Sequence, residues 1–216
     1  MYVKDWMTKN PVCLSADNSV MDAFNAMKEG DFHRIPICDN GKIIGLITNT
    51  TLADYTPSKA TTLSVFEINS LLQKTTCKDI MVKDVVTITS DALLEEAADK
   101  MMVNNITCLP VVDKDTEKLI GIITQKVIFG AFVDLMGYYA HGSRIVIQIE
   151  KDQPGVLEKV AHVLAQNNIN ISHLAVYHYD NVSIVVRVYD EDATKIKELL
   201  ETNGYKVTDY RINKID

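Results

Sequence analysis

The 216-residue sequence lacks the features that bring a chain into or across a membrane. Its longest apolar run, residues 127–133, is far shorter than the roughly 18 to 20 apolar residues that span a bilayer. The first residues, Met1 to Asp5, carry no basic region followed by an apolar core, as a secretion signal would. We therefore expect a soluble, cytoplasmic protein with no membrane partner.

Clustered positive charge is also absent. The chain carries 22 Lys and Arg against 29 Asp and Glu, a net charge of −7, and no run of five or more basic residues. Because a protein that binds DNA or RNA neutralises phosphates with a basic patch, nucleic acid is not an expected partner. The apolar fraction of 47% and the charged fraction of 24% are those of an ordinary globular protein with a core.

Motifs for metal binding and catalysis are missing as well. No C-x-x-C pair occurs among the four cysteines, so we expect reduced thiols at Cys13, Cys38, Cys77 and Cys108. His173 and His178 are five residues apart on one expected strand, and therefore point to opposite faces and cannot share a metal ion. There is no P-loop, G-x-S-x-G or H-E-x-x-H motif. The sequence predicts neither an enzyme nor a metalloprotein.

An internal repeat occupies the first two thirds of the chain. Lys4-Asp5-Trp6-Met7 is matched by Lys78-Asp79-Ile80-Met81, an offset of 74 residues. The match continues in register: residues 20–27 match 94–101, residues 35–37 match 109–111, and, after a two-residue insertion, residues 45–48 match 121–124. The N-terminal region is therefore a duplicated unit.

Each copy shows the same expected order of elements. Apolar residues three and four apart mark an amphipathic helix, and short apolar runs mark strands. Side chains that cap a helix start occur at Asp17 and Ser19 in the first copy and at Ser90 and Asp91 in the second. Asp39-Asn40-Gly41 predicts a hairpin turn, because Asn and Gly tolerate positive φ. We predict strand–helix–strand–strand–helix in each copy, after a short leading segment.

These landmarks resemble the cystathionine-beta-synthase-type (CBS) repeat. The resemblance rests on three segments and their counterparts in the second copy: Met7-Thr8-Lys9-Asn10-Pro11-Val12, Ile35-Pro36-Ile37 and Gly45-Leu46-Ile47-Thr48. It implies a CBS pair, or Bateman-type module, with repeats at residues 1–58 and 77–136. Residues 59–76 form a linker with a short helix, an insertion that resembles that of the acetoin-utilisation protein B family.

The C-terminal third has a different pattern. Residues 143–150 alternate between apolar and polar side chains, as in a half-buried strand, and Asp152-Gln153-Pro154-Gly155 breaks this strand. A helical stripe follows, and the remaining expected elements are strands near residues 169–179 and 182–189, a helix near 193–200 and a strand near 207–212. The order βαββαβ is the ferredoxin-like arrangement.

The loop after the first of these strands resembles that of ACT domains. Asp152-Gln153-Pro154-Gly155-Val156-Leu157 and Asn168-Ile169-Asn170-Ile171 are similar to the D-x-P-G-x-L and N-I signatures of that family. The resemblance implies an ACT domain at residues 143–214. The expected fold class is α/β (α+β), a CBS pair followed by a ferredoxin-like domain, again the order of the acetoin-utilisation protein B family.

The CBS resemblance implies an adenosine ligand, such as AMP, ATP or S-adenosylmethionine, between the copies. In that family an Asp three residues after a Thr holds both ribose hydroxyls, since a carboxylate accepts two hydrogen bonds from a diol. Here that position is Thr51 in the first copy and Val127 in the second. The candidate nucleotide-binding residues, with Arg34 as a phosphate clamp, are Arg34, Ile35, Pro36, Thr48, Thr51, Leu109, Pro110 and Thr124. Equally open are a surface position for Arg34 and a purely structural hydrogen bond for Thr48.

The ACT resemblance implies an amino-acid ligand at Asp152, Gly155 and Asn170. Gly155 lies at an expected helix start, where free N–H groups and the helix dipole favour a carboxylate. Asp152 is suited to an ammonium group, and the Asn170 amide both donates and accepts. The alternative is that Asp152 and Asn170 only cap a turn and a strand.

The leading hypothesis from the sequence is a regulatory sensor. It binds an adenine nucleotide or related adenosyl ligand in the CBS clefts and an amino acid at the ACT site, and controls an unidentified protein partner in acetoin utilisation. Both resembling families imply a homodimer. A ligand-free oligomerisation or interaction module is the second hypothesis, favoured by the missing Asp side chains. An enzyme of acetoin breakdown is the third, and it lacks a catalytic constellation.

Overall fold

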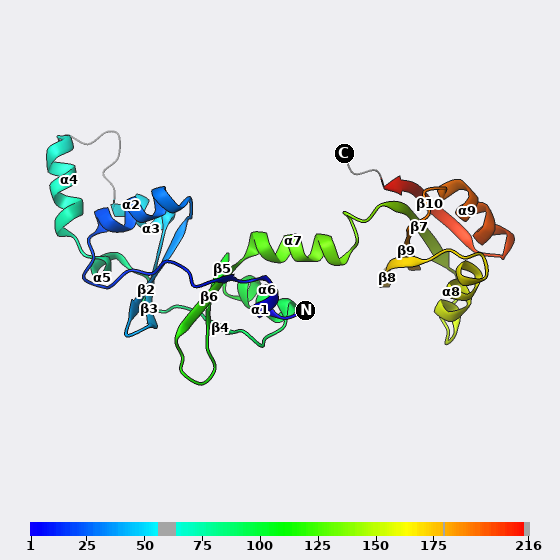
Figure 1. Ribbon diagram of the computed structural model, residues 1–216, viewed down its shortest axis with the longest axis horizontal. Helices are drawn as coiled ribbons and strands as arrows, with labels where there is room; N and C mark the ends of the chain where they lie inside the picture. Colours follow the sequence, from blue (N-terminus) through cyan, green and yellow to red (C-terminus); the bar gives the residue numbers. More distant parts are fainter. Residues whose placement is uncertain (56–63, 179, 214–216) are drawn as a thin grey trace. The chain divides into compact units, whose positions relative to one another are not determined.

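The computed structural model describes residues 1–55, 64–178 and 180–213. The chain divides into two compact units, Met1–Ile128 and Phe129–Asp216 (Figure 1). The expected boundary between residues 58 and 59, the end of the C-terminal domain at residue 214 and the strand end at Tyr179 lie outside the described residues. None of the helices in the described ranges combines the length and apolar character that a membrane span requires.

The first unit contains two copies of the repeat in the expected order of elements, except that the last helix of the second copy continues into the second unit. The elements of the first copy and of the linker are α1 (Val3–Trp6), β1 (Thr8–Lys9), α2 (Val20–Gly30), β2 (Arg34–Asp39), β3 (Lys42–Thr48), α3 (Asn49–Tyr55) and α4 (Val65–Lys74). Those of the second are α5 (Cys77–Ile80), β4 (Ile88–Thr89), α6 (Leu94–Val103), β5 (Cys108–Val112), β6 (Leu119–Thr124) and α7 (Gln125–Leu135). The first strand of the first copy is reduced to one parallel bridge between Leu14 and Ile37.

The leading segment of each copy packs on the other copy. β1 pairs with β6, giving the second copy the sheet order β1-β6-β5-β4, and the Val3 N–H donates to the Ala92 carbonyl. Reciprocally, Val82, just after α5, bridges Leu46 of β3, and the Cys77 N–H donates to the Asn18 carbonyl. This exchange ties the two copies into one unit.

Local sequence fixes the helix starts, with one correction. Ser19 caps α2 through a capping box in which its side chain accepts from the Asp22 N–H. In the second copy the expected caps, Ser90 and Asp91, do not act on α6. Its N-cap is Leu93, which has no polar side chain to cap the helix; only the other half of a capping box is present, in which the Leu93 N–H donates to the Glu96 carboxylate.

The hairpin and the core of the first copy follow the sequence pattern. Asn40 and Gly41 have φ of +50° and +81°, as the turn between β2 and β3 requires. Alternate residues of β2 point into the core, where Ile35 and Ile37 are fully buried with Ile47 of β3. Helix α2 covers them, and α4 adds Leu72 to the same core.

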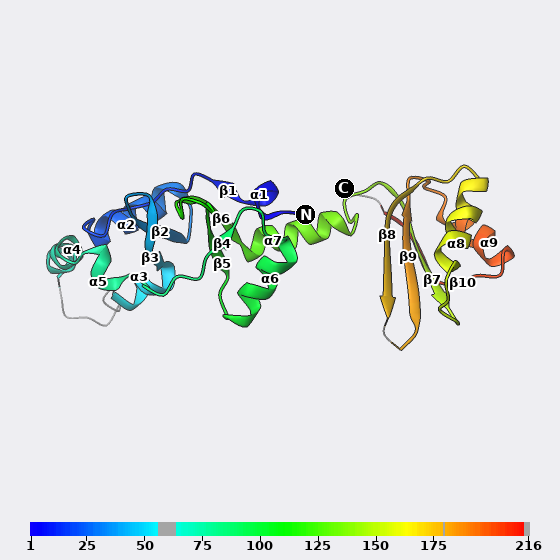
Figure 2. The ribbon, with the colours of Figure 1, turned by 90° about the horizontal axis from the view of Figure 1, so that it is seen from below.

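The second unit has the expected βαββαβ order. Its elements are β7 (Gly142–Ile149), α8 (Val156–Gln166), β8 (Ile171–His178), β9 (Val182–Val188), α9 (Ala193–Thr202) and β10 (Lys206–Asn213). The antiparallel sheet has the order β10-β7-β9-β8, and α8 and α9 both lie on one face of it (Figure 2). The opposite face carries neither of these two helices, and the predicted mixed α/β class is confirmed.

Candidate functional site

A cleft of about 290 Å³ opens between the two copies of the first unit. One wall comes from the facing ends of β2 and β3 and the start of α3. The other comes from the segment after α5 and from the segment that leads into β5. The lining residues are 33, 34, 46 and 48–50 of the first copy and 82, 84–86, 105–108 and 110 of the second. The exchange of leading segments is what brings residues 82–86 to this place.

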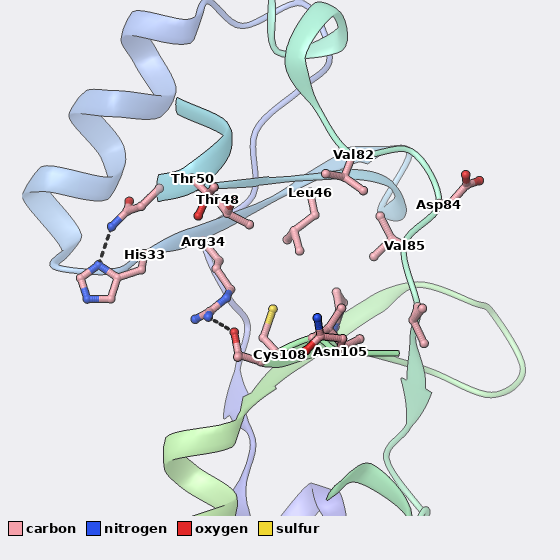
Figure 3. Close-up of a pocket in the computed structure, with 15 residues that line it drawn as sticks. His33, Arg34, Leu46, Thr48, Thr50, Val82, Asp84, Val85, Asn105 and Cys108 are labelled. Atoms are coloured by element: carbon pink, nitrogen blue, oxygen red, sulfur yellow. Dashed lines mark hydrogen bonds between the residues drawn. The ribbon is translucent and has the colours of Figure 1, made fainter. Parts of the chain in front are cut away.

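Arg34 spans the cleft from one copy to the other. It is the first residue of β2, and its Nη2 donates to Thr107 Oγ1 of the second copy (Figure 3). Beside it, Asn49 Nδ2 and His33 Nδ1 are hydrogen-bonded at 2.9 Å. A guanidinium presents several N–H donors in a fixed plane, which suits a phosphate or carboxylate group. This end of the cleft therefore carries a positive charge.

The rest of the cleft is mainly apolar. Figure 3 shows Leu46, Val82 and Val85 on one side of the space and Cys108 on the other. Burial raises the pKa of the Cys108 thiol, and Arg34 opposes this only in part, so the side chain remains a neutral thiol. Such walls suit the flat, apolar faces of a base. Asp84 lines the cleft, but its carboxylate points away from these side chains in Figure 3.

Two threonine hydroxyls bond each other at the end of β3. Thr48 Oγ1 and Thr51 Oγ1 are 2.9 Å apart, and Thr48 Oγ1 also accepts from the Thr51 N–H at 3.1 Å. These bonds fix the start of α3, so the structural role considered for Thr48 is present in the molecule. Thr48 nevertheless lines the cleft, whereas Thr51 does not.

The structure gathers only part of the expected nucleotide site. Arg34, Thr48 and Pro110 line the cleft. Ile35 and Leu109 are fully buried, because alternate residues of a strand point to opposite faces. The remaining expected residues are also outside this lining: Pro36, which is buried in β2, Thr51, and Thr124, whose Oγ1 accepts from the Val127 N–H at 3.4 Å.

Sequence reasoning missed the contribution of the second copy. Val82, Val85 and Asn105 line the cleft, although none of them was among the candidate site residues. A signal for the first two was present: residues 81–86 are the counterpart of the Met7–Val12 motif. What the sequence did not show was that each motif serves the opposite copy.

The expected amino-acid site lies on the loop after β7. The Asp152 carboxylate is 3.2 Å from His178 Nε2 at the end of β8, and both side chains are more than half exposed. Gly155 is the N-cap of α8 with φ of +88°, and a Cβ there would meet open space. The positive φ therefore explains this glycine better than close packing does. Asn170 is exposed, and its carbonyl accepts from the Tyr189 N–H.

A shallow hollow of about 290 Å³ lies beside the same loop, but Asp152, Gly155 and Asn170 do not line it. Its charged residues are Lys151, Lys159, Lys206 and Glu150, and Tyr205 also lines it. Burial raises the pKa of Tyr205, and Glu158 adds to this effect. The loop thus has a single acid–histidine pair, with a basic hollow elsewhere on its surface.

Comparison with known families agrees with this architecture. The CBS domain model matches residues 3–57 and 77–134, which is more than half of the chain, and the ACT domain model matches residues 143–202. The chain belongs to the CBS-domain family. It consists of two CBS domains followed by an ACT domain, which are regulatory modules, and the resemblance drawn from the sequence is confirmed.

Three solved structures are similar to the CBS pair. A protein of Vibrio cholerae assigned to acetoin utilization is 31% identical, with a TM-score of 0.52, over 64% of this chain and 95% of that one. A CBS pair solved with 5′-methylthioadenosine and S-adenosyl-L-methionine is 29% identical, with a TM-score of 0.51, over 62% and 97%. CBSX2 solved with AMP is 26% identical, with a TM-score of 0.51, over 62% and 96%.

The first curated relatives that the chain matches are longer proteins. The inosine-5′-monophosphate dehydrogenase of Methanocaldococcus jannaschii is 28% identical over 201 residues, which is 92% of this chain and 36% of that enzyme. This chain spans less than half the length of the first curated relatives that it matches. Some relatives of this CBS-domain protein are therefore enzymes with additional regions.

Proposed function

We propose that this protein is a regulatory sensor that binds an adenine nucleotide in the cleft between its CBS domains. The observation that carries the proposal is Arg34, which reaches across an apolar-walled cleft to Thr107 and presents a cation at one end of it. Support also comes from the similar CBS pairs solved with AMP and with S-adenosyl-L-methionine. A base against Leu46 and Val85 and a phosphate on Arg34 account for both halves of the cleft.

The charges of the cleft favour a phosphorylated ligand. S-adenosylmethionine carries a sulfonium and an ammonium group, and both need a carboxylate or an equivalent acceptor. Asp84 is the acid at the cleft, and it points away. The ribose has no Asp at position 51, where a threonine hydroxyl already bonds Thr48. We therefore expect AMP to bind more tightly than S-adenosylmethionine.

The test is isothermal titration of the purified chain with AMP, ADP, ATP and S-adenosylmethionine at fixed salt. Arg34→Gln should weaken AMP binding by roughly tenfold or more, the loss expected for one charge-assisted hydrogen bond. Lys42→Gln is the matched control, because Lys42 also joins the copies, through Glu117 at 2.6 Å, but lies outside the cleft. Equal affinity in wild type and Arg34→Gln would remove the phosphate from Arg34.

The ACT domain is proposed to bind an amino acid on the Asp152 loop. Asp152 now faces His178, so a ligand ammonium group would replace that contact while the N–H groups at the start of α8 receive its carboxylate. Titration with a panel of amino acids tests this, and Asp152→Ala should abolish binding without unfolding. Glu201→Ala removes an acid with a comparable exposed ion pair, to Lys197, and should leave binding unchanged. Retained affinity in Asp152→Ala would exclude this loop.

The proposed output is control of a protein partner by a homodimer, with acetoin utilisation as the setting suggested by the Vibrio cholerae neighbour. A ligand acts on such an arrangement only through its different affinities for two states, typically about 1–3 kcal/mol of coupling. Sedimentation velocity with and without the bound nucleotide measures whether the chain forms a homodimer and whether the nucleotide changes that assembly. A ligand-free interaction module is the second candidate, because Thr51 and Val127 occupy the positions of the ribose-binding Asp. The absence of binding by every nucleotide and every amino acid tested would support it.

A further inference from the structure

The face of the ACT sheet opposite α8 and α9 carries a row of basic side chains across all four strands. The strand register places Arg211 of β10 opposite Arg144 of β7, Arg144 opposite Arg187 of β9, and Arg187 opposite His173 of β8. Like charges that lie directly opposite each other on one face destabilise a sheet. A row of this kind therefore needs an anion to balance it.

The acid of this face balances only one side of the row. Asp209 Oδ2 accepts from Arg144 Nη1 at 2.7 Å and from Arg211 Nη2 at 2.8 Å, so two guanidinium groups share one carboxylate. Among the described residues, no carboxylate contributes to the pKa of Arg187. That pKa is lowered by burial and then by Arg144, while Tyr177 and Tyr138 have the opposite effect.

Arg187 is also incompletely bonded. Arg187 as a whole is half-buried, but its Nη1 atom is buried from solvent and has no hydrogen-bond partner within the described residues. Because a buried, unpaired polar group is costly, and a charged one more so, such a donor indicates a missing acceptor. Since Arg187 lies opposite Arg144 and His173 in the strand register, an anion is the acceptor that would also offset this positive charge.

The turn between α7 and β7 lies against the same side chains. A Cβ on Gly137 would lie 2.4 Å from His173 Nδ1 and 2.9 Å from Arg187 Cδ, so its backbone packs directly on them. The Tyr138 and Ala140 carbonyls accept from Asn213 Nδ2, at 2.6 and 2.7 Å, which holds the turn on the sheet. Any group bound at Arg187 would contact this turn.

We propose that this face of the ACT domain binds a small oxyanion, a carboxylate or a phosphate group, with Arg187 as its main donor and Arg144 and His173 beside it. The site is distinct from the Asp152 loop and from the CBS cleft. Binding relieves the repulsion between Arg144 and Arg187 and gives Nη1 of Arg187 its acceptor. It also changes the environment of the turn at Gly137, and so of the segment that connects α7 to the ACT sheet.

The experiment uses the full ¹⁵N-labelled chain carrying Arg34→Gln, so that phosphate does not also bind the proposed nucleotide site. Inorganic phosphate and acetate are titrated separately at constant ionic strength, and backbone amide shifts are followed. We expect saturable shifts at residues 137–140, 144, 173 and 187, with the tighter probe identifying the ligand class. Shifts that stay linear for both probes, or that saturate only at other residues, would overturn the proposal.

Arg187→Gln and Arg211→Gln form a matched pair, since each removes one positive charge from the row. Arg211 is 65% exposed and already bonded to Asp209. Arg187→Gln should weaken the tighter probe by about tenfold or more, the loss of one charge-assisted hydrogen bond, and Arg211→Gln by less than about threefold. Equal weakening would show a general charge effect and refute the site. If Arg187→Gln does not fold, the location of the shifts in the chain with Arg187 intact decides the question.

Discussion

Because each leading segment packs on the other copy, a substitution in the leading segment of one copy should destabilise the other copy. Val3 of α1 is fully buried, and its N–H bonds the Ala92 carbonyl of the second copy. Val3→Ala removes two methyl groups at about 0.8 kcal/mol each, and the cavity that remains raises the cost to about 2 kcal/mol. Since about 1.4 kcal/mol is a factor of ten, local opening of the second copy should become about 30-fold more frequent.

Hydrogen–deuterium exchange measured by mass spectrometry separates the two copies. In Val3→Ala, peptides that contain α6 should lose more protection than peptides that contain α2, although Val3 belongs to the first copy by sequence. Ile80→Ala is the reciprocal variant, because Ile80 of α5 is buried in the core of the first copy. It should expose α2 more than α6. The same ranking of the two helices in both variants would refute the exchange.

Two further predictions concern the cleft and the thiols. Thr48→Ala should weaken nucleotide binding by a few-fold, the net value of one neutral hydrogen bond, and by more than Thr124→Ala does, because only Thr48 lines the cleft; the reverse order in parallel titrations would move the better site to the second copy. Burial raises the pKa of Cys38 to about 12, with Cys13 adding to the shift, while Cys13 itself is exposed. Iodoacetamide at pH 8 should therefore alkylate Cys13 and spare Cys38 until the protein is denatured, and peptide mapping that shows equal rates would contradict this burial.

Most of the fold was predictable because local patterns determine it. The repeat, the hairpin at Asn40 and the order of elements in the ACT domain each follow from side-chain periodicity or from one turn residue. The helix start at Leu93 was missed because this N-cap has no polar side chain, and only the bond from the Leu93 N–H to the Glu96 carboxylate marks it. The exchange of leading segments could not be predicted from periodicity, because the sequence pattern of β1 is compatible with pairing to a strand of either copy.

The site was predictable only in part, for a geometric reason. The motif comparison selected whole triplets such as Ile35-Pro36-Ile37, but a strand sends alternate side chains to opposite faces. Ile35 therefore belongs to the core, and Arg34, one residue earlier, reaches the cleft. Strand parity was available from the sequence. The wall of the cleft that the second copy provides was not predictable, because it depends on the exchange of leading segments between the copies.

The two copies do not contribute equally to the cleft, because equivalent positions on their strands carry different side chains. At the offset of 74 residues, the position of Arg34 in the second copy is Cys108, whose buried thiol has a raised pKa and carries no charge at neutral pH. The cation of Arg34 therefore has no counterpart in the second copy, and the position three residues after the second threonine is Val127 in place of an acid. Cys108 lines the same cleft as Arg34 and contributes an apolar side chain to it. Position 34 and its counterpart 108 thus line the same cleft, with a guanidinium on one copy and a neutral thiol on the other, so we expect a nucleotide that depends on a phosphate contact to bind once per chain.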